Sequence, residues 1–154
     1  MQVTPEARLR ELDIELPAPN RSLASYVPTV RCGGMVYLSG QIPMLDGALM
    51  LTGKVGGGVS DVDGTAAARR CAINAMAALK AEVGELSQVK RIVKLTVFIA
   101  SDPSFTGQSQ VANGASDLFL EVFGDLGRHA RSAVGVACLP LGSPVEVELI
   151  AEVA

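Results

Sequence analysis

The spacing of apolar residues along the chain predicts an alternation of helices and strands. Positions 89–100 and 145–153 alternate between apolar and polar residues with a period of two, which is typical of half-buried strands. On the first of these strands we expect one face to carry Val93, Leu95, Val97 and Ile99. Apolar residues between positions 61 and 84 recur instead at helical spacing, and a second long helix is expected from about Ser104 to Val122.

Shorter signals complete the predicted order. Thr4-Pro5-Glu6 has the N-cap, first-turn proline and early acid of a helix that should run to about Leu12. Strands are expected at 35–39, 48–52 and 132–138, the second of them after an Asp46-Gly47 turn. The fold class is therefore α+β: one sheet covered on one face by two long helices, with an extra short N-terminal helix. We expect a single domain over 1–154, in which 1–20 form the N-terminal helix and its connection and 21–154 form the core.

Composition narrows the possible partners. The net charge is −3 and hydrophobic residues make up 49% of the chain against 19% charged residues. A general nucleic-acid binder usually has a basic surface, so we expect no nucleic-acid partner. The low fraction of charged residues favours an oligomer. The N-terminal stretch does not resemble a signal peptide, and no apolar run is long enough to span a membrane. Three cysteines favour a reducing cytoplasm; Cys71 and Cys138 are expected in the core and Cys32 in an exposed loop.

Few residues offer catalytic chemistry. His129, the only histidine, follows Arg128 in a predicted loop and is expected to be exposed, and the cysteines and this histidine do not form a metal-ligand pattern, so no metal is expected. Arg131 lies at the start of a predicted strand, where a guanidinium could grip a carboxylate with two donors. Glu146 and Glu148 share one face of the last strand, which we expect to neighbour the strand of Arg131. Either these groups form a site, or Arg131 merely pairs with one of the glutamates.

Three blocks of sequence resemble the RidA/YjgF family, also called endoribonuclease L-PSP-like. They are Ala130-Arg131-Ser132 through Leu139-Pro140 followed by Val145–Glu148, Tyr26-Val27 followed by Val36–Pro43, and Val93–Ile99. The resemblance runs from about Tyr26 to the C-terminus. It implies a chorismate-mutase-like fold, a homotrimer with clefts between subunits, and hydrolysis of 2-imino or enamino acids to 2-oxo acids and ammonia. It implies no cofactor.

The resemblance also implies roles for individual residues. Arg131 matches the arginine that binds the substrate carboxylate, and Glu146 matches the glutamate that holds the attacking water. Tyr26 matches a tyrosine at the pocket mouth, and Ser39-Gly40 matches the segment whose backbone lines the pocket. Two positions depart from the family pattern: a frequent cysteine is Ala133 here, and a polar residue after the central strand is Pro103. Because of these departures, the alternative remains that the protein binds a small carboxylate or carbonyl metabolite without turnover. RNA cleavage, which the older label of the family suggests, fits the acidic chain less well.

Overall fold

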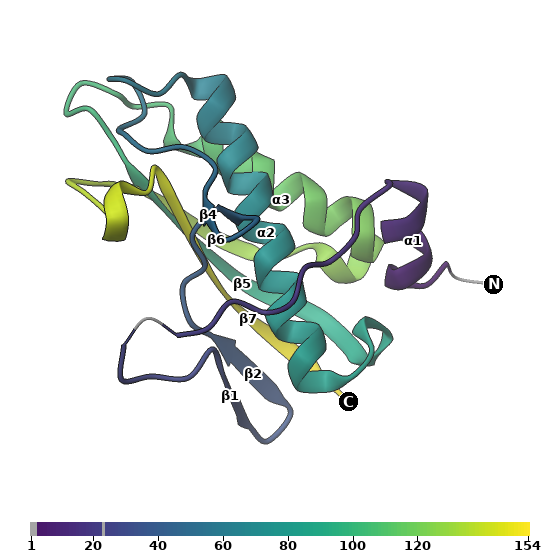
Figure 1. Cartoon of the computed structure of the whole chain (residues 1–154). Coiled ribbons are helices and arrows are strands. Elements are labelled where there is room, and N and C mark those ends of the chain that lie inside the picture. Colours follow the sequence, from purple (N-terminus) through teal and green to yellow (C-terminus); the bar gives the residue numbers. More distant parts are fainter. Residues whose placement is uncertain (1–2, 23) are drawn as a thin grey trace.

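The protein forms one sheet with helices on one side, as seen in a computed structural model that describes residues 3–22 and 24–154 (Figure 1). Met1 and Gln2, which belong to the N-terminal stretch considered above, lie outside the described residues. The elements follow in the order α1 (Pro5–Glu11), β1 (Thr29–Cys32), β2 (Met35–Leu38), β3 (Met44–Leu45), β4 (Ala48–Leu49), α2 (Asp61–Val83), η1 (Leu86–Gln88), β5 (Val89–Ala100), α3 (Gln108–Phe123), η2 (Gly124–Gly127), β6 (Ala130–Val136), η3 (Pro140–Gly142) and β7 (Val145–Val153).

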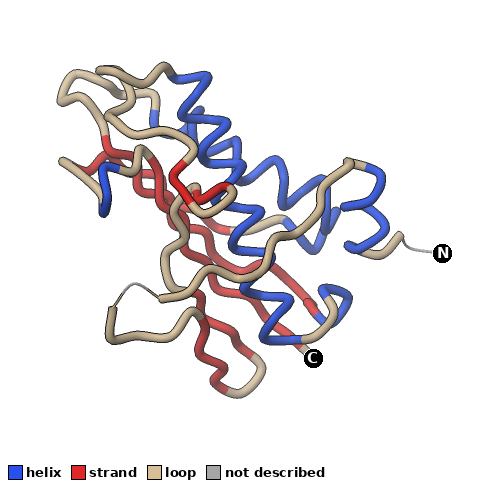
Figure 2. Tube along the Cα trace, viewed as in Figure 1, coloured by secondary structure: helices blue, strands red, loops and turns tan. Residues whose placement is uncertain are grey.

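The main sheet has five strands in the order β1-β2-β7-β5-β6, and β3 and β4 form a separate small hairpin. Strand β6 runs parallel to β5, while the other neighbours are antiparallel. This topology places β5 between β6 and β7, so the expectation that the strand of Arg131 neighbours the strand of Glu146 is wrong. The predicted α+β class, with two long helices on one face and a short N-terminal helix, is confirmed (Figure 2).

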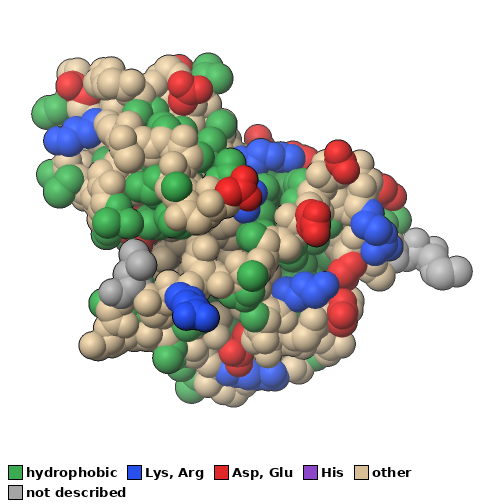
Figure 3. All heavy atoms as spheres, in the orientation of Figure 1, with side chains coloured by type: hydrophobic (Ala, Val, Ile, Leu, Met, Phe, Trp, Pro, Cys, Tyr) green, Lys and Arg blue, Asp and Glu red, His purple; other side chains and the backbone are tan. Residues whose placement is uncertain are grey.

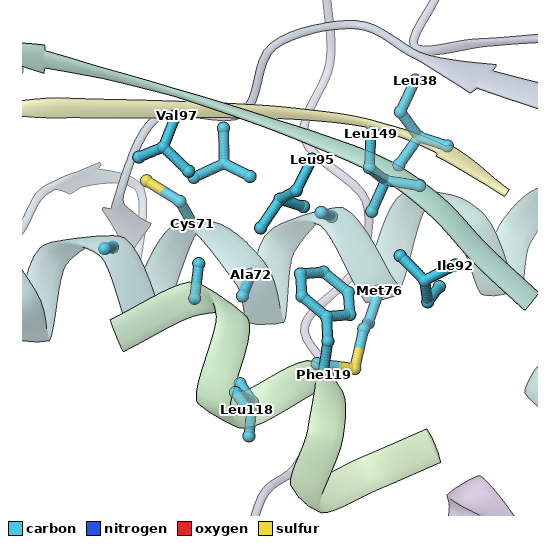
Figure 4. Close-up of a cluster of buried hydrophobic side chains, with 14 of the residues drawn as sticks. Leu38, Cys71, Ala72, Met76, Ile92, Leu95, Val97, Leu118, Phe119 and Leu149 are labelled. Atoms are coloured by element: carbon cyan, nitrogen blue, oxygen red, sulfur yellow. The ribbon is translucent and has the colours of Figure 1, made fainter. Parts of the chain in front are cut away.

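The core lies between the sheet and the helix pair α2 and α3. In Figure 4, Leu95, Val97 and Leu149 from the sheet meet Cys71, Met76 and Phe119 from the helices, and all of these side chains are buried. The two helices approach closely at Gly114, where an added Cβ would overlap the backbone carbonyl of Thr65. The close contact explains why a glycine occurs in the middle of a helix, where it would otherwise cost about 1 kcal/mol.

Local rules explain most element ends. Helix α2 begins after Ser60, whose hydroxyl accepts a hydrogen bond from the Asp63 N–H, and ends at Gly84 with φ of 86°. Helix α3 begins at Gln108 and not at Ser104, because the Asp102 carboxylate accepts hydrogen bonds from both the N–H and the hydroxyl of Ser104. These bonds hold the segment before α3 in a turn.

Three further expectations are wrong for reasons of strand pairing. Strand β6 ends at Val136, the partner of Ala100 at the end of β5, so Cys138 extends beyond the pairing and is exposed. Cys32 is exposed as predicted, but it lies in strand β1 and not in a loop. A register shift between Ile92 and Lys94 gives the buried position to Ile92 and leaves Val93 half-buried.

None of the helices in the described part of the chain covers the opposite face of the sheet (Figure 1). The half-buried glutamates of β7 lie on this open face, as do the exposed side chains of Tyr37 on β2 and Val134 on β6. On the side of the molecule shown in Figure 3, acidic and basic side chains are interspersed. None of the described helices has the length and apolar character needed to cross a membrane.

Candidate functional site

Glu146 lies in a pocket of about 440 Å³ at one end of the sheet, a volume typical of small-ligand sites. The pocket is lined by Asn20, Arg21, Ser22, Tyr26, Pro28, Gly40, Gln41, Ile42, Met44, Gly47, Pro140 and Glu146. Burial, followed by the negative charge of Glu148, raises the pKa of the Glu146 carboxyl above its ordinary value. A carboxylate with a raised pKa is a better proton acceptor, which suits a general base.

Gly40 gives the Glu146 carboxylate its room. A Cβ added at Gly40 would lie 2.7 Å from the carboxyl carbon and 2.9 Å from Cγ of Glu146. Both distances are far shorter than an ordinary van der Waals contact. Glycine at position 40 therefore lets the carboxylate lie directly against the backbone.

Ser39 holds the segment of Tyr26 in place. Its hydroxyl donates to the Val27 carbonyl at 2.7 Å, and its N–H donates to the Pro28 carbonyl at 2.9 Å. The structure thus brings Tyr26, Gly40 and Glu146 to one pocket, and Ser39 precedes Gly40 without lining the pocket itself. Four of the five residues singled out from the sequence gather at this end of the sheet.

Arg131, the fifth, lies on the other face. It is in register with Leu95 of β5, which is in turn in register with Leu149 of β7, and both leucines are buried against the helices. Glu146 is in register with Phe98, whose partner on β6 is Val134. Because residues side by side in a sheet point to the same face, Arg131 and Glu146 point to opposite faces.

Three hydrogen bonds to α3 fix the guanidinium of Arg131. Its Nη1 donates to Asn113 Oδ1 at 2.8 Å and to Ser116 Oγ at 3.1 Å, and its Nη2 donates to the Ser109 carbonyl at 3.2 Å. Among the described residues no carboxylate forms a salt bridge with Arg131, so the alternative of an ion pair with Glu146 or Glu148 is wrong. Three of the five N–H groups of the guanidinium are used, and two remain for a ligand.

Arg131 opens into a shallow hollow of about 340 Å³, lined by Asn113, Ser116, Asp117, Leu120, Arg128, His129 and Arg131. His129 is half-buried here and not exposed as expected. Its Nε2 lies 2.8 Å from Ser116 Oγ, and its Nδ1 lies 2.7 Å from the Gly127 carbonyl. The sequence reasoning missed Asn113 and Ser116, although positions 109, 113 and 116 form a polar stripe at helical spacing that could have revealed them.

Metal-ligating side chains are dispersed. Within residues 3–22 and 24–154, no three His, Cys, Asp or Glu side chains are grouped as a metal site would require. Pro103, which the sequence resemblance aligns with a polar residue, lies outside both pockets described above and lines a separate hollow with Phe105 and Gln108. The candidate chemistry therefore rests on a fixed guanidinium on one face of the sheet and a carboxylate pocket on the other.

Comparisons with known proteins agree with the sequence resemblance. A family model described as "YjgF/chorismate mutase-like, putative endoribonuclease" matches residues 6–153. Protein TCP17 of Trypanosoma cruzi is 50% identical over 147 residues, which cover 95% of this chain and 92% of that protein. The crystal structure of a "putative endoribonuclease" from Shewanella oneidensis MR-1 is 39% identical with a TM-score of 0.95, and the match covers 97% of this chain and 99% of that one. The structure of E. coli TdcF with bound serine is 28% identical with a TM-score of 0.62, over 89% of this chain and 94% of that one. The chain therefore belongs to the RidA/YjgF family and has its chorismate-mutase-like fold.

Proposed function

We propose that this protein hydrolyses reactive 2-imino and enamino acids to 2-oxo acids and ammonia. In this reaction the oxygen of water bonds to the imine carbon while one water proton moves to the nitrogen, which leaves a single carbon–nitrogen bond. That bond then breaks as the new carbon–oxygen bond becomes a carbonyl, and the hydroxyl proton moves to the departing nitrogen, which is released as ammonia. The reaction needs a group to orient the substrate and a base to align the water.

The observation that carries the proposal is the state of Arg131. Its guanidinium is held by three hydrogen bonds to α3 and keeps two N–H donors free. A carboxylate accepts such a pair of donors side by side, and hydrogen bonds between charged groups contribute about 1.5–3 kcal/mol each. Fixing the carboxylate of an imino acid fixes its imine carbon as well, because only one bond separates the two groups.

Glu146 is the proposed base. Its pocket contains Tyr26 and the glycine backbone that the family resemblance assigns to the substrate site. The raised pKa of its carboxyl suits it to accept a proton from water and to return that proton to nitrogen. Solved TdcF binds serine, a small amino acid with the same carboxylate, which supports this class of ligand for the family.

Arg131 and Glu146 point to opposite faces of one subunit, so the proposed site needs more than one copy of the chain. We propose a homotrimer in which the Arg131 side of one subunit meets the Glu146 pocket of the next. The open sheet face, with exposed Tyr37 and Val134, offers apolar surface for such contacts. Light scattering on the purified protein tests the oligomeric state.

A second function is favoured because Arg131 and Glu146 lie on opposite faces of one subunit. In one subunit the Arg131 hollow contains no carboxylate that could serve as a base beside the guanidinium except Asp117, which is exposed. Arg131 would then bind a small carboxylate or carbonyl metabolite without turnover. The RNA cleavage suggested by the relatives' names is a third outcome, against which the net charge of −3 argues.

Ammonia release from freshly generated 2-iminobutyrate tests the proposal. We expect turnover above the buffer rate for the wild type, loss of turnover in Arg131→Ala, and unchanged turnover in Arg8→Ala. Arg8 is the matched control because it is an arginine that pairs with Glu11 on α1 and does not line the Arg131 hollow. Tight binding of 2-oxobutyrate without turnover would favour the binding protein, and Arg131-dependent cleavage of RNA by highly purified protein would favour the nuclease.

The compartment is also a proposal. The three cysteines, Cys32, Cys71 and Cys138, are free, and two of them are exposed. Exposed free thiols are usual in reducing compartments, so we propose the cytoplasm. Fractionation of cells that produce the protein, with an antibody against the whole chain, tests this location.

A further inference from the structure

We propose that Ser116 and His129 are positioning residues for Arg131. They form a hydrogen-bond relay that runs from the Gly127 carbonyl to the guanidinium and that sets how tightly the site holds a substrate carboxylate. The inference deepens the proposed function and rests on it for the ligand of Arg131. It assigns a task to the only histidine of the chain, which the proposed reaction does not otherwise use.

The chemistry of the partners fixes the direction of every bond in the relay. The Gly127 carbonyl can only accept, so the proton of the neutral imidazole must lie on Nδ1, 2.7 Å away. Nε2 is then an acceptor, and the Ser116 hydroxyl donates to it across 2.8 Å. The Ser116 oxygen keeps its lone pairs for Arg131 Nη1 at 3.1 Å. Each member thereby orients the next.

Packing holds the imidazole in this orientation. The ring of Phe119 meets it edge to face, with the centroids 6.2 Å apart and the planes at 76°. Gly127 lies so close to α3 that an added Cβ would overlap the Phe119 carbonyl oxygen. The turn η2 therefore packs against helix α3, and this contact fixes the position of the Gly127 carbonyl relative to His129.

Burial and charge keep His129 in the neutral state that the relay needs. Burial first, and then the positive charge of Arg131, lower the pKa of His129, although the hydrogen bond to Gly127 acts in the opposite direction. The charged groups around the ring are Asp117 on α3, Asp125 and Arg128 at the turn η2, and Arg131 on β6. Lys94 on β5 is directed to the open face, where it donates to Ser132.

Protonation of His129 would break the relay. Both ring nitrogens would then donate, so the Ser116 hydroxyl would lose its acceptor and its proton would have to turn elsewhere. A second cation beside Arg131 would by itself attract a carboxylate. We expect the loss of the relay to outweigh this attraction, so that carboxylate binding weakens as the pH falls through the lowered pKa of His129.

The tautomer can be read directly because the chain has one histidine. Nitrogen NMR of ¹⁵N-histidine-labelled, untagged protein near neutral pH should show the Nδ1–H form with an unprotonated Nε2. The ring should titrate at a pH below that of a free histidine. An Nε2–H tautomer would overturn the relay whatever ligand the protein binds.

Binding constants for 2-oxobutyrate, measured by calorimetry between about pH 5 and pH 8, test the effect on Arg131. The measurements use the Glu146→Gln background, which removes the titration of Glu146. We expect Ser116→Ala and His129→Phe to raise the Kd about three- to tenfold at neutral pH, as the loss of a single hydrogen bond does. His129→Gln, whose amide oxygen can accept from Ser116 but does not titrate, should retain tight binding and lose the weakening at acid pH. Arg8→Ala is the control and should change neither, because Arg8 lies on α1, pairs with Glu11 and does not line the Arg131 hollow.

Kinetics separate positioning from chemistry. In the chain with Glu146 intact, Ser116→Ala should raise KM by the same factor as Kd while kcat stays within about twofold. If Ser116→Ala leaves Kd and KM unchanged, or if His129→Gln keeps the acid weakening, the relay is overturned. If the wild type does not turn over imines but the Kd for 2-oxobutyrate still changes in these variants as expected, only the proposed deaminase activity is overturned. Absence of any 2-oxobutyrate binding by the wild type would overturn both.

Discussion

Replacing Gly40 by alanine should displace the Glu146 carboxylate and lower kcat while the fold stays intact. The added Cβ would lie 2.7 Å from the carboxyl carbon of Glu146, whereas an ordinary van der Waals contact begins at 3.4 Å. The carboxyl group must therefore move by at least about 0.7 Å, the difference between these two distances. Gly40 does not have a positive φ, so alanine adds no backbone strain.

The size of the effect follows from that displacement. A misplacement of about 1 Å in a reacting geometry can cost about 100-fold in rate, so we expect kcat to fall about 30- to 100-fold. Stability should change little, because a half-buried side chain can turn away from the new methyl group. We expect a change within about 1 kcal/mol, which is about 2–4 °C in Tm for a chain of this size.

Steady-state ammonia release and a thermal melt measure the two quantities on the same preparation. Gly58→Ala is the matched control, because nothing lies within 4 Å of its added Cβ and its φ is not positive. A Gly40→Ala protein with wild-type kcat would refute the placement of Glu146 as the base.

Three other predictions concern stability and reactivity. Burial raises the pKa of Glu146, so the folded protein should lose stability as the pH rises from the unfolded value near 4.5 through the raised pKa. Glu146→Gln should therefore raise Tm at pH 8 but not at pH 4. Equal Tm differences at the two pH values would contradict this. Gly114→Ala should destabilise the protein by about 1–3 kcal/mol in urea titrations, because its methyl group would strike the Thr65 carbonyl of α2, and an unchanged midpoint would count against that contact. Burial raises the pKa of the Cys71 thiol, so a disulfide reagent should modify only Cys32 and Cys138 in the native protein. In denaturant the reagent should modify all three cysteines. Rapid modification of three thiols in the native protein would show that Cys71 is accessible.

Elements governed by neighbouring residues could be predicted from the sequence almost to the residue. The strand β7 begins at Val145 and ends at Val153 as its alternation indicates, since a period of two over nine residues has a single good register. Helix α2 begins and ends where Ser60 and Gly84 predict, because capping depends on residues within one turn. The start of α3 was missed because the Asp102 turn competed with the helix for the same backbone.

The face on which Arg131 lies could not be predicted in this way. Alternation along β6 shows that Arg131 and Ala133 share a face, but the strand carries small or polar residues on both faces, so its own pattern does not say which face meets the helices. That choice depends on the pairing of β6 with β5, and hence on contacts distant in sequence. The same pairing decides that Cys138 lies beyond the sheet. Position-by-position resemblance found the residues of the site but not their distribution over two faces.

Mixed oligomers of Arg131→Ala and Glu146→Gln subunits test most directly whether one active site draws on two copies of the chain. Each variant alone should release no ammonia from 2-iminobutyrate above the buffer rate. After the two are unfolded and refolded together in equal amounts, about a quarter of the sites should combine an intact Arg131 with an intact Glu146 from a neighbouring subunit. Recovery of about a quarter of the wild-type activity would agree with the shared site. Mixed oligomers as inactive as their parents, with both subunits present in the same particles, would contradict it.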